Sequence, residues 1–235
     1  MGKVRQQHEF QITTLKDKHP SWGNQKISVI AANSNEELTK GVAQAIYQRL
    51  RLATYRNTEQ RIAEPSDAIR RSRRPNEIWA CDITQTRDQN GKTLYWFAIV
   101  DEFTLECLCL DVKRNWDGAD ITTSFDGIAQ ERGLPQTIRT DNEKLWCSRS
   151  LKSWLRNREI GHRLIRNGSP WQNGVVESFF SQLHRELLNL ATFSDLADAE
   201  AQAKQFQEVY NEIRPHGSLG FRPPSKYARS LQRPQ

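Results

Sequence analysis

Three strand-like segments follow one another between residues 78 and 112, and they constrain the fold of this 235-residue chain more than any other feature. Segment 78–87 alternates apolar and polar residues, and the Asn90-Gly91 pair behind it is a strong hairpin signal. Segments 94–101 and 105–112 are apolar and aromatic. Three consecutive strands joined by short turns predict an antiparallel meander.

The sequence after the meander alternates between helix and strand. Helical patterns cover 119–132, 151–158, 173–190 and 195–213, while short strands are predicted at 137–140 and 162–165. A polar loop rich in Gly and Pro covers 166–172. This order predicts an α/β core with a mixed sheet, three antiparallel strands followed by parallel strands, and flanking helices.

The first 62 residues are predicted to be helical throughout. One helix ends near Pro20, because proline disfavours helix in the residue before it. A second runs from Trp22 to Ala31 and stops at 33–35, and Thr39 is a plausible N-cap for a third. Two short helices across a short polar break match a helix-turn-helix, and an ordinary three-helix bundle with a polar face fits equally well.

The third helix has two predicted faces. Val42, Ala45, Ile46, Arg49 and Leu50 form its expected apolar stripe. The opposite face would reach base edges and phosphates if the helix enters a groove of DNA. Its expected members are Lys40, Gln44, Tyr47, Gln48 and Arg51.

Positive charge is concentrated in the first third of the chain. Residues 1–75 carry 14 Lys and Arg against 7 Asp and Glu, whereas residues 76–235 carry 20 against 21. The excess peaks at Arg70, Arg71, Arg73 and Arg74, inside a polar linker predicted at 63–76. A basic segment joined to a near-neutral body favours a nucleic-acid partner, and a solvated basic linker is the alternative.

Composition excludes several classes of protein. Hydrophobic residues make up 37% of the chain, enough for a core, so a wholly disordered chain is excluded. The longest apolar run, 94–100, is far shorter than the ~20 residues of a membrane span, and the first ten residues lack the apolar stretch of a secretory signal. Four cysteines without a CxxC pair suggest buried free thiols in a reducing compartment rather than disulfides or zinc. We therefore expect a cytoplasmic protein with no membrane partner.

Three carboxylates fall where such a fold would bring them together. Asp82 lies inside the first strand, where a buried acid is costly unless it is paired or binds a metal. Asp141 follows the fourth strand, and Glu177 lies in the first turn of the long helix. Hard oxygen donors of this kind suit Mg²⁺ or Mn²⁺, and two such ions support phosphodiester chemistry. Any one of these acids taken alone is more simply structural.

The spacing of these acids resembles a known family. Asp141 and Glu177 are separated by 35 residues, and Asp82 lies upstream in a WxxDxT strand. This pattern resembles the D,D(35)E triad of retroviral-type integrases and of bacterial insertion-sequence transposases. The transposase branch is also similar at Thr140-Asp141-Asn142, at 169–180 (SPWQNGVVESFF) and at 210–216 (YNEIRPH). The resemblance covers residues 76–228, and residues 20–50 resemble the helix-turn-helix that precedes such cores.

The resemblance implies an RNase H-like core in which Asp82, Asp141 and Glu177 bind two Mg²⁺ or Mn²⁺ ions. They would catalyse donor-end cleavage and then strand transfer by the freed 3′-hydroxyl. The implied partners are double-stranded DNA (element ends and target), further copies of the chain in a synaptic homo-multimer, and a second element-encoded DNA-binding protein. The implied location is the bacterial cytoplasm, in association with the nucleoid.

Two departures from the family pattern stand out. Glu143 replaces the glycine that usually follows Asp141-Asn142, and the arginine common in the second strand turn is absent from 103–106. Two other functions remain open: a DNA-binding regulator that keeps the fold without recombination, and an RNase H-like nuclease that cuts without joining.

The remaining candidates have competing structural roles. Trp171 would stack on an unpaired base or pack on the helix, and His184 would contact DNA, assist proton transfer or be solvated. Asp101, Asp111, Arg214 and His216 are expected to be structural. The expected domains are a DNA-binding domain (1–62), a basic linker (63–76), a catalytic core (77–213) and a tail packed on the core (214–235). The full set of candidate DNA contacts is Lys40, Gln44, Gln48, Arg51, Arg70, Arg71, Arg73, Arg74, Arg166, Trp171, His184 and Arg185, and Lys144 is a weaker one.

Overall fold

Five strands form one mixed sheet, as the sequence predicts. They are β1 (Ile78–Arg87), β2 (Thr93–Asp101), β3 (Cys107–Lys113), β4 (Thr137–Thr140) and β5 (Gly161–Leu164). Their order in the sheet is β3-β2-β1-β4-β5. The β1–β2 and β2–β3 pairs are antiparallel, and the β1–β4 and β4–β5 pairs are parallel. The expected meander followed by parallel strands is therefore confirmed.

The computed structural model describes residues 2–35, 37–50, 52, 72–165 and 173–232. The chain forms two compact units. One holds the N-terminal helices with Ile213–Pro223, and the other holds the sheet, its helices and the C-terminal helix. No helix in these described ranges is long and apolar enough to cross a membrane.

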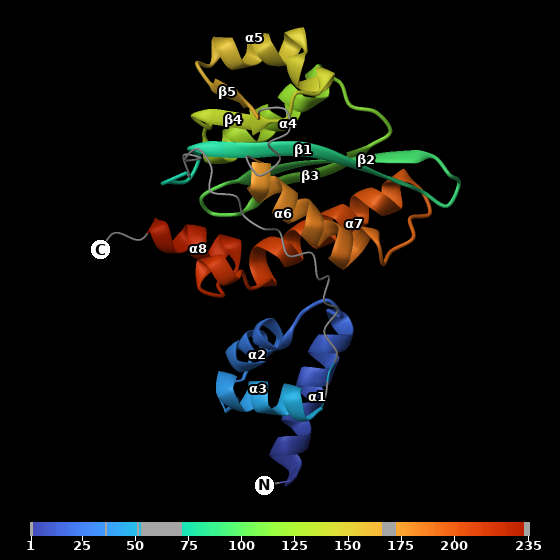
Figure 1. The fold of residues 1–235 in the computed structure, drawn as a ribbon, viewed down its shortest axis with the longest axis vertical. Coiled ribbons are helices and arrows are strands. Elements are labelled where there is room, and N and C mark those ends of the chain that lie inside the picture. Colours follow the sequence, from blue (N-terminus) through green and yellow to red (C-terminus); the bar gives the residue numbers. More distant parts are fainter. Residues whose placement is uncertain (1, 36, 51, 53–71, 166–172, 233–235) are drawn as a thin grey trace. The chain divides into compact units, whose positions relative to one another are not determined.

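Helices cover both faces of the sheet (Figure 1). Trp96, Ala98 and Val100 of β2 point into a core shared with α6 (Gly174–Leu183) and α7 (Leu196–Glu208). Phe97 and Ile99 alternate to the opposite face, which α4 (Gly118–Arg132) and α5 (Arg149–Asn157) cover. The period of two along a strand buried on both faces explains why this segment is apolar without interruption.

The two long helices change geometry before they end. The sequence predicts continuous helices over 173–190 and 195–213. Instead, α6 gives way at His184–Leu188 to a π-helical turn, and α7 does so at Val209–Ile213. The 3.6-residue pattern of apolar positions does not distinguish one π turn from the helix that it continues. The helix α8 (Pro224–Leu231) and the 3₁₀ turns Lys144–Cys147 and Gly217–Leu219 were not predicted.

Asn211 closes the outer edge of the sheet. Its side-chain amide accepts the backbone N–H of Cys107 at 2.9 Å and donates to the carbonyl of the same residue at 2.9 Å. The Gln207 amide donates to that carbonyl at 2.8 Å. Edge strand β3 thus finds side-chain partners where a further strand would otherwise pair.

The C-terminal helix packs within the sheet unit. The Tyr227 ring lies 6.0 Å from that of Phe103, and Arg229 pairs with Glu212 at 2.7 Å. All four cysteines are free thiols, with Cys81, Cys107 and Cys109 buried and Cys147 exposed.

The N-terminal unit contains α1 (Gly2–Lys18), α2 (Asn24–Asn33) and α3 (Lys40–Arg49), close to the predicted bounds. The Thr39 hydroxyl accepts the Val42 N–H, as expected of an N-cap. The expected faces of α3 are wrong in part: Val42 and Ala45 are exposed, and Tyr47 is buried with Ala43 and Ile46. An apolar stripe through positions 43, 46 and 47 has helical spacing too, and contact with α1 and α2 decides between the two registers. The helix-turn-helix remains a prediction.

Candidate active site

Asp82 and Asp141 come from neighbouring parallel strands. Ala80 on β1 is paired with Arg139 on β4, so Asp82 and Asp141, two residues further along each strand, reach the same level of the sheet. Ala80 belongs to the core beneath α6 and α7, and the period of two turns Asp82 to this same face. The end of β4 at Thr140 leaves Asp141 at the carboxyl edge of the sheet.

Glu177 approaches these acids from the first turn of α6. The buried stripe Val176, Phe179, Phe180 and Leu183 anchors this helix, which packs on β1 and β2. Glu177 is half-buried at the border of this stripe. An acid in the first turn is also favoured by the helix dipole.

The pKa of Asp82 is shifted by its burial and by the charges of other acids. Burial is the largest cause that raises the pKa of Asp82, which reaches about 7. The backbone N–H of Ile83 donates to Asp82 Oδ1 at 2.8 Å and lowers this pKa. The negative charges of Asp141, Glu143 and Glu177 raise it further. Asp82 therefore interacts electrostatically with the other two predicted acids, Asp141 and Glu177, and with Glu143 as well.

The donor set fits a hard divalent cation. Carboxylate oxygens are the ligands that Mg²⁺ and Mn²⁺ prefer, and a cation would relieve the repulsion around Asp82. Within the described parts of the chain, no three His, Cys, Asp or Glu side chains are gathered tightly enough to hold a metal ion as they stand.

Glu143 takes part in this site although the sequence marks it only as a departure from the family pattern. Its backbone N–H donates to Asp141 Oδ1 at 2.9 Å, which orients that carboxylate. Burial and the charge of Asp141 raise the pKa of the Glu143 side chain. An acid where the family has glycine was the signal for this role.

His184 has a protein partner on the strand that carries Asp82. Its Nε2 lies 3.2 Å from Oγ1 of Thr84, two residues beyond Asp82 on the same face of β1. His184 is half-buried and begins the π turn that follows α6. The hydrogen bond ties the far end of the Glu177 helix to the Asp82 strand, a role that sequence reasoning missed.

The other candidate DNA contacts are divided between the two units, and five of them lie outside the described residues. Lys40, Gln48, Arg73, Arg74 and Arg185 are exposed, and Gln44 is half-buried. The Arg185 side chain donates to the carbonyl of Ser181, one turn earlier. Outside the described residues lie Arg51, Arg70, Arg71, Arg166 and Trp171.

The residues expected to be structural have structural contacts. The Asp101 carboxylate accepts three backbone N–H groups, from Asn76, Phe103 and Thr104, at 2.7–2.9 Å. Asp111 accepts the Cys109 thiol at 3.1 Å. Arg214 and His216 are buried.

The strand order, the mixed pairing and the helices on both faces define an RNase H-like core. Family models described as "Integrase core domain" match residues 72–170 and 158–224. A chain of the simian T-cell lymphotropic virus intasome structure, solved in complex with the PP2A regulatory subunit B56 gamma, aligns with a TM-score of 0.59 and 21% identity. The alignment covers 87% of this chain and 72% of that one.

Curated relatives come from bacterial insertion elements. An uncharacterized 31.7 kDa protein of IS407 from Burkholderia multivorans is 34% identical over 154 residues, covering 66% of this chain and 56% of the relative. A 39.2 kDa protein of IS476 from Xanthomonas euvesicatoria is 34% identical over 161 residues, covering 68% and 46%. The transposase of IS904 from Lactococcus lactis is 28% identical over 156 residues, covering 65% and 61%.

These matches confirm the resemblance seen in the sequence. The chain belongs to the family of DDE transposases and integrases that share the retroviral-type integrase core. It spans about half the length of the first two relatives.

Proposed function

We propose that this protein is a DNA transposase or integrase that binds the ends of a mobile element, cleaves the donor DNA and joins the 3′-hydroxyl ends to target DNA. Asp82, Asp141 and Glu177 are its catalytic residues and hold two Mg²⁺ or Mn²⁺ ions. The observation that carries the proposal is the register of β1 against β4, which sets Asp82 and Asp141 at one level of an integrase core, with Glu177 on the helix α6 that packs on β1.

The chemistry needs one bond made for each bond broken. In cleavage, a water oxygen attacks a donor phosphorus and the bond to the 3′-oxygen breaks, which leaves a free 3′-hydroxyl. In joining, that hydroxyl attacks a target phosphorus and displaces another 3′-oxygen, so no external energy source is needed. When bound, the pair of cations activates the attacking oxygen and stabilises the leaving one.

The chain's own residues supply orientation. Strands β1 and β4 fix Asp82 and Asp141 at one level, and the buried stripe of α6 fixes Glu177. The Glu143 N–H orients the Asp141 carboxylate, and the Thr84–His184 contact limits how far α6 can move from β1. Preorganised groups of this kind lose little free energy to reorganisation during the reaction.

The proposal extends to partners and domains. Residues 1–62 bind DNA, 63–76 form a basic linker and 77–213 form the catalytic core, and 214–235 form a tail whose helix α8 belongs to the core unit. Two element ends must be joined together, so the protein acts as a homo-multimer in the cytoplasm, near the nucleoid, with room for a second element-encoded DNA-binding protein. A structural neighbour's description as part of an intasome supports this assembly.

A strand-transfer assay tests the function. The purified chain receives labelled element ends with a free 3′-hydroxyl and a plasmid target, with Mg²⁺ or Mn²⁺ and with EDTA. We expect metal-dependent joining that Asp141→Asn and Glu177→Gln abolish while end binding persists. The exposed Glu200→Gln on α7 is the matched control and keeps activity. Cutting without joining would identify a nuclease, and DNA binding without either reaction would identify a regulator.

A further inference from the structure

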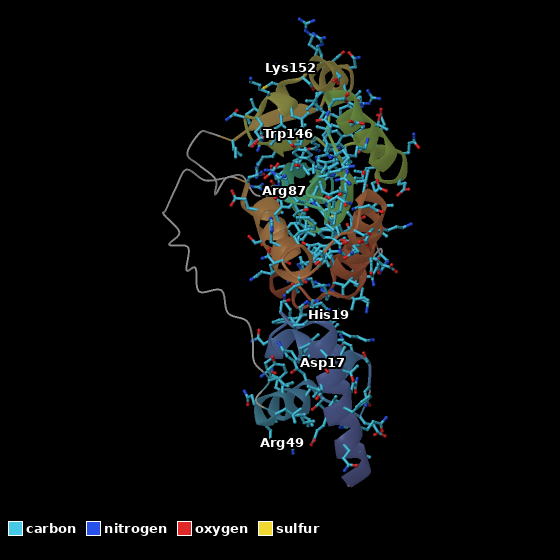
Figure 2. The ribbon with its side chains drawn as sticks, turned by 90° about the vertical axis from the view of Figure 1, so that its right-hand side faces the viewer. Asp17, His19, Arg49, Arg87, Trp146 and Lys152 are labelled. Atoms are coloured by element: carbon cyan, nitrogen blue, oxygen red, sulfur yellow. The ribbon has the colours of Figure 1, made fainter. Side chains whose placement is uncertain are left out.

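We propose that the exposed face of α5, formed by Arg149, Lys152 and Arg156, binds the phosphate backbone of duplex DNA. This inference rests on the proposed function and assigns part of its DNA contact to a helix that sequence reasoning left without a role. Figure 2 shows Lys152 on the outer side of α5, with Trp146 deeper, toward the strands.

The three basic side chains share one face of the helix. They are three and four residues apart and all exposed, whereas Leu151, Trp154 and Leu155 point the opposite way into the core under α4. The Ser148 hydroxyl caps the helix by accepting the Leu151 N–H. The buried stripe and the cap hold the basic face outward.

This face departs from the charge balance around it. Residues 144–163 hold six Lys and Arg against one acid, Glu159, in a region (76–235) with 20 basic and 21 acidic residues. Basic residues at these spacings on a helix repel one another. A polyanion such as the DNA backbone relieves that repulsion.

These three residues also differ from other cations of the same unit. Arg114, Arg132 and Arg139 pair with Asp88, Glu106 and Glu102 at 2.6, 2.6 and 2.5 Å. Across the described ranges, Arg149, Lys152 and Arg156 form no ion pair with a carboxylate. Their charges are therefore available to a ligand.

An electrostatic interaction and a hydrogen bond connect this face to the acids. The pKa of His162 is lowered by burial and then by the charge of Lys152. His162 Nε2 lies 3.0 Å from Thr140 Oγ1, and Thr140 immediately precedes Asp141. The span from Arg149 to Arg156 is about 10 Å at 1.5 Å per residue, which corresponds to roughly three phosphates of one strand.

Salt dependence of binding tests the proposal without any catalysis. The triple variant R149Q/K152Q/R156Q is compared with wild type by fluorescence anisotropy on a random-sequence duplex, in EDTA, over about 50–200 mM salt. Each phosphate contact contributes about 0.9 to the slope of log K against log salt, so we expect a slope shallower by about 2 to 3. If the triple variant keeps the wild-type slope, these three side chains do not contact phosphates and the proposal is wrong.

Two controls separate location and charge from other effects. K92Q/K204Q/K226Q removes three exposed charges elsewhere on the same unit and should keep the wild-type slope. R149K/R156K keeps the charges and should also keep it. Loss of the slope in either control would contradict specific phosphate contact by this face.

The same variants identify which DNA is bound. If the face holds the target, the triple variant raises the target concentration needed for half-maximal joining and leaves element-end affinity unchanged. If it holds the element end, end affinity falls instead. If the protein joins no DNA ends but the triple variant still changes the slope, the proposed function is wrong and the α5 surface is supported. If the protein joins ends but the slope is unchanged, only the α5 surface is wrong.

Discussion

At the residue scale, Asp82 is a carboxylate in an environment that disfavours its charged form. It is an acid on a central strand, raised in pKa by burial and by three other acids. A group whose folded-state pKa exceeds its ordinary value of 3.8 destabilises the fold at pH values where it is charged. A structural role would favour a neutral residue here, so the presence of a carboxylate supports a role in binding a cation.

Asp82→Asn should therefore stabilise the protein in EDTA. The folded pKa of about 7 lies above the unfolded value, so the penalty is fully present above about pH 7 and disappears towards pH 4, where both states are protonated. We expect a gain on the order of a few kcal/mol at pH 8 that shrinks as the pH falls. Thermal unfolding followed by circular dichroism across this range measures it.

Asp120→Asn is the opposite control for that measurement. A hydrogen bond and ion pair with Lys113 lower the pKa of Asp120, so removing the Asp120 carboxylate should reduce stability near neutral pH.

Added Mg²⁺ should raise the melting temperature of wild type and leave that of Asp82→Asn almost unchanged. An Asp82→Asn protein that melts below wild type at pH 8 would contradict the electrostatic account.

At the scale of elements, the contact between the Glu177 helix and the Asp82 strand controls the geometry of the site. We expect Thr84→Val to lower the rate of strand transfer roughly fivefold, since removing one hydrogen bond costs about 1 kcal/mol, while DNA affinity is kept. His184→Gln keeps a polar group near the position of Nε2 and should retain most activity. Single-turnover joining and end-binding titrations separate the rate from the affinity.

The contrary outcome has its own signature. If His184 instead contacts DNA, His184→Gln weakens binding and Thr84→Val changes nothing. A double variant whose loss of activity equals that of Thr84→Val alone would show that the two side chains act through their shared hydrogen bond.

The elements were largely predictable because their signals are local. Strands β1 and β4 begin and end at the predicted residues, since alternation, the Asn90-Gly91 turn and flanking polar residues mark them. The π turns and the buried face of α3 were not predictable, because alternatives with nearly the same period compete until tertiary packing selects one. For this reason the sequence predicts an outward Tyr47, whereas the structure buries it.

The site was predictable only in its parts. The sequence identifies as candidates an acid inside an apolar strand (Asp82), an acid that follows a strand (Asp141) and an acid in the first turn of a helix (Glu177). The partnership of Thr84 with His184 joins residues 100 apart, and no local pattern encodes it. The effect of Glu143 on Asp82 likewise depends on β1 and β4 being neighbours in the sheet.

At the scale of the whole molecule, charge is divided between two stretches. The first 75 residues hold an excess of +7, with Arg70, Arg71, Arg73 and Arg74 at its peak, and residues 144–163 hold a second excess inside a near-neutral body. Two basic stretches separated in sequence would contact DNA at different phosphates. Sequence-independent affinity is then a sum over both stretches.

Replacing the four arginines by glutamine should flatten the salt dependence of binding to a random-sequence duplex by up to about 3.6, at roughly 0.9 for each phosphate that is no longer neutralised. Combined with R149Q/K152Q/R156Q, the change in slope should equal the sum of the two separate changes if the two sets contact different phosphates. Anisotropy titrations of the three proteins measure this directly. If the combined variant changes the slope no more than one set of substitutions alone, both stretches compete for the same phosphates. If the four-arginine variant leaves the slope unchanged, residues 63–76 are a solvated linker.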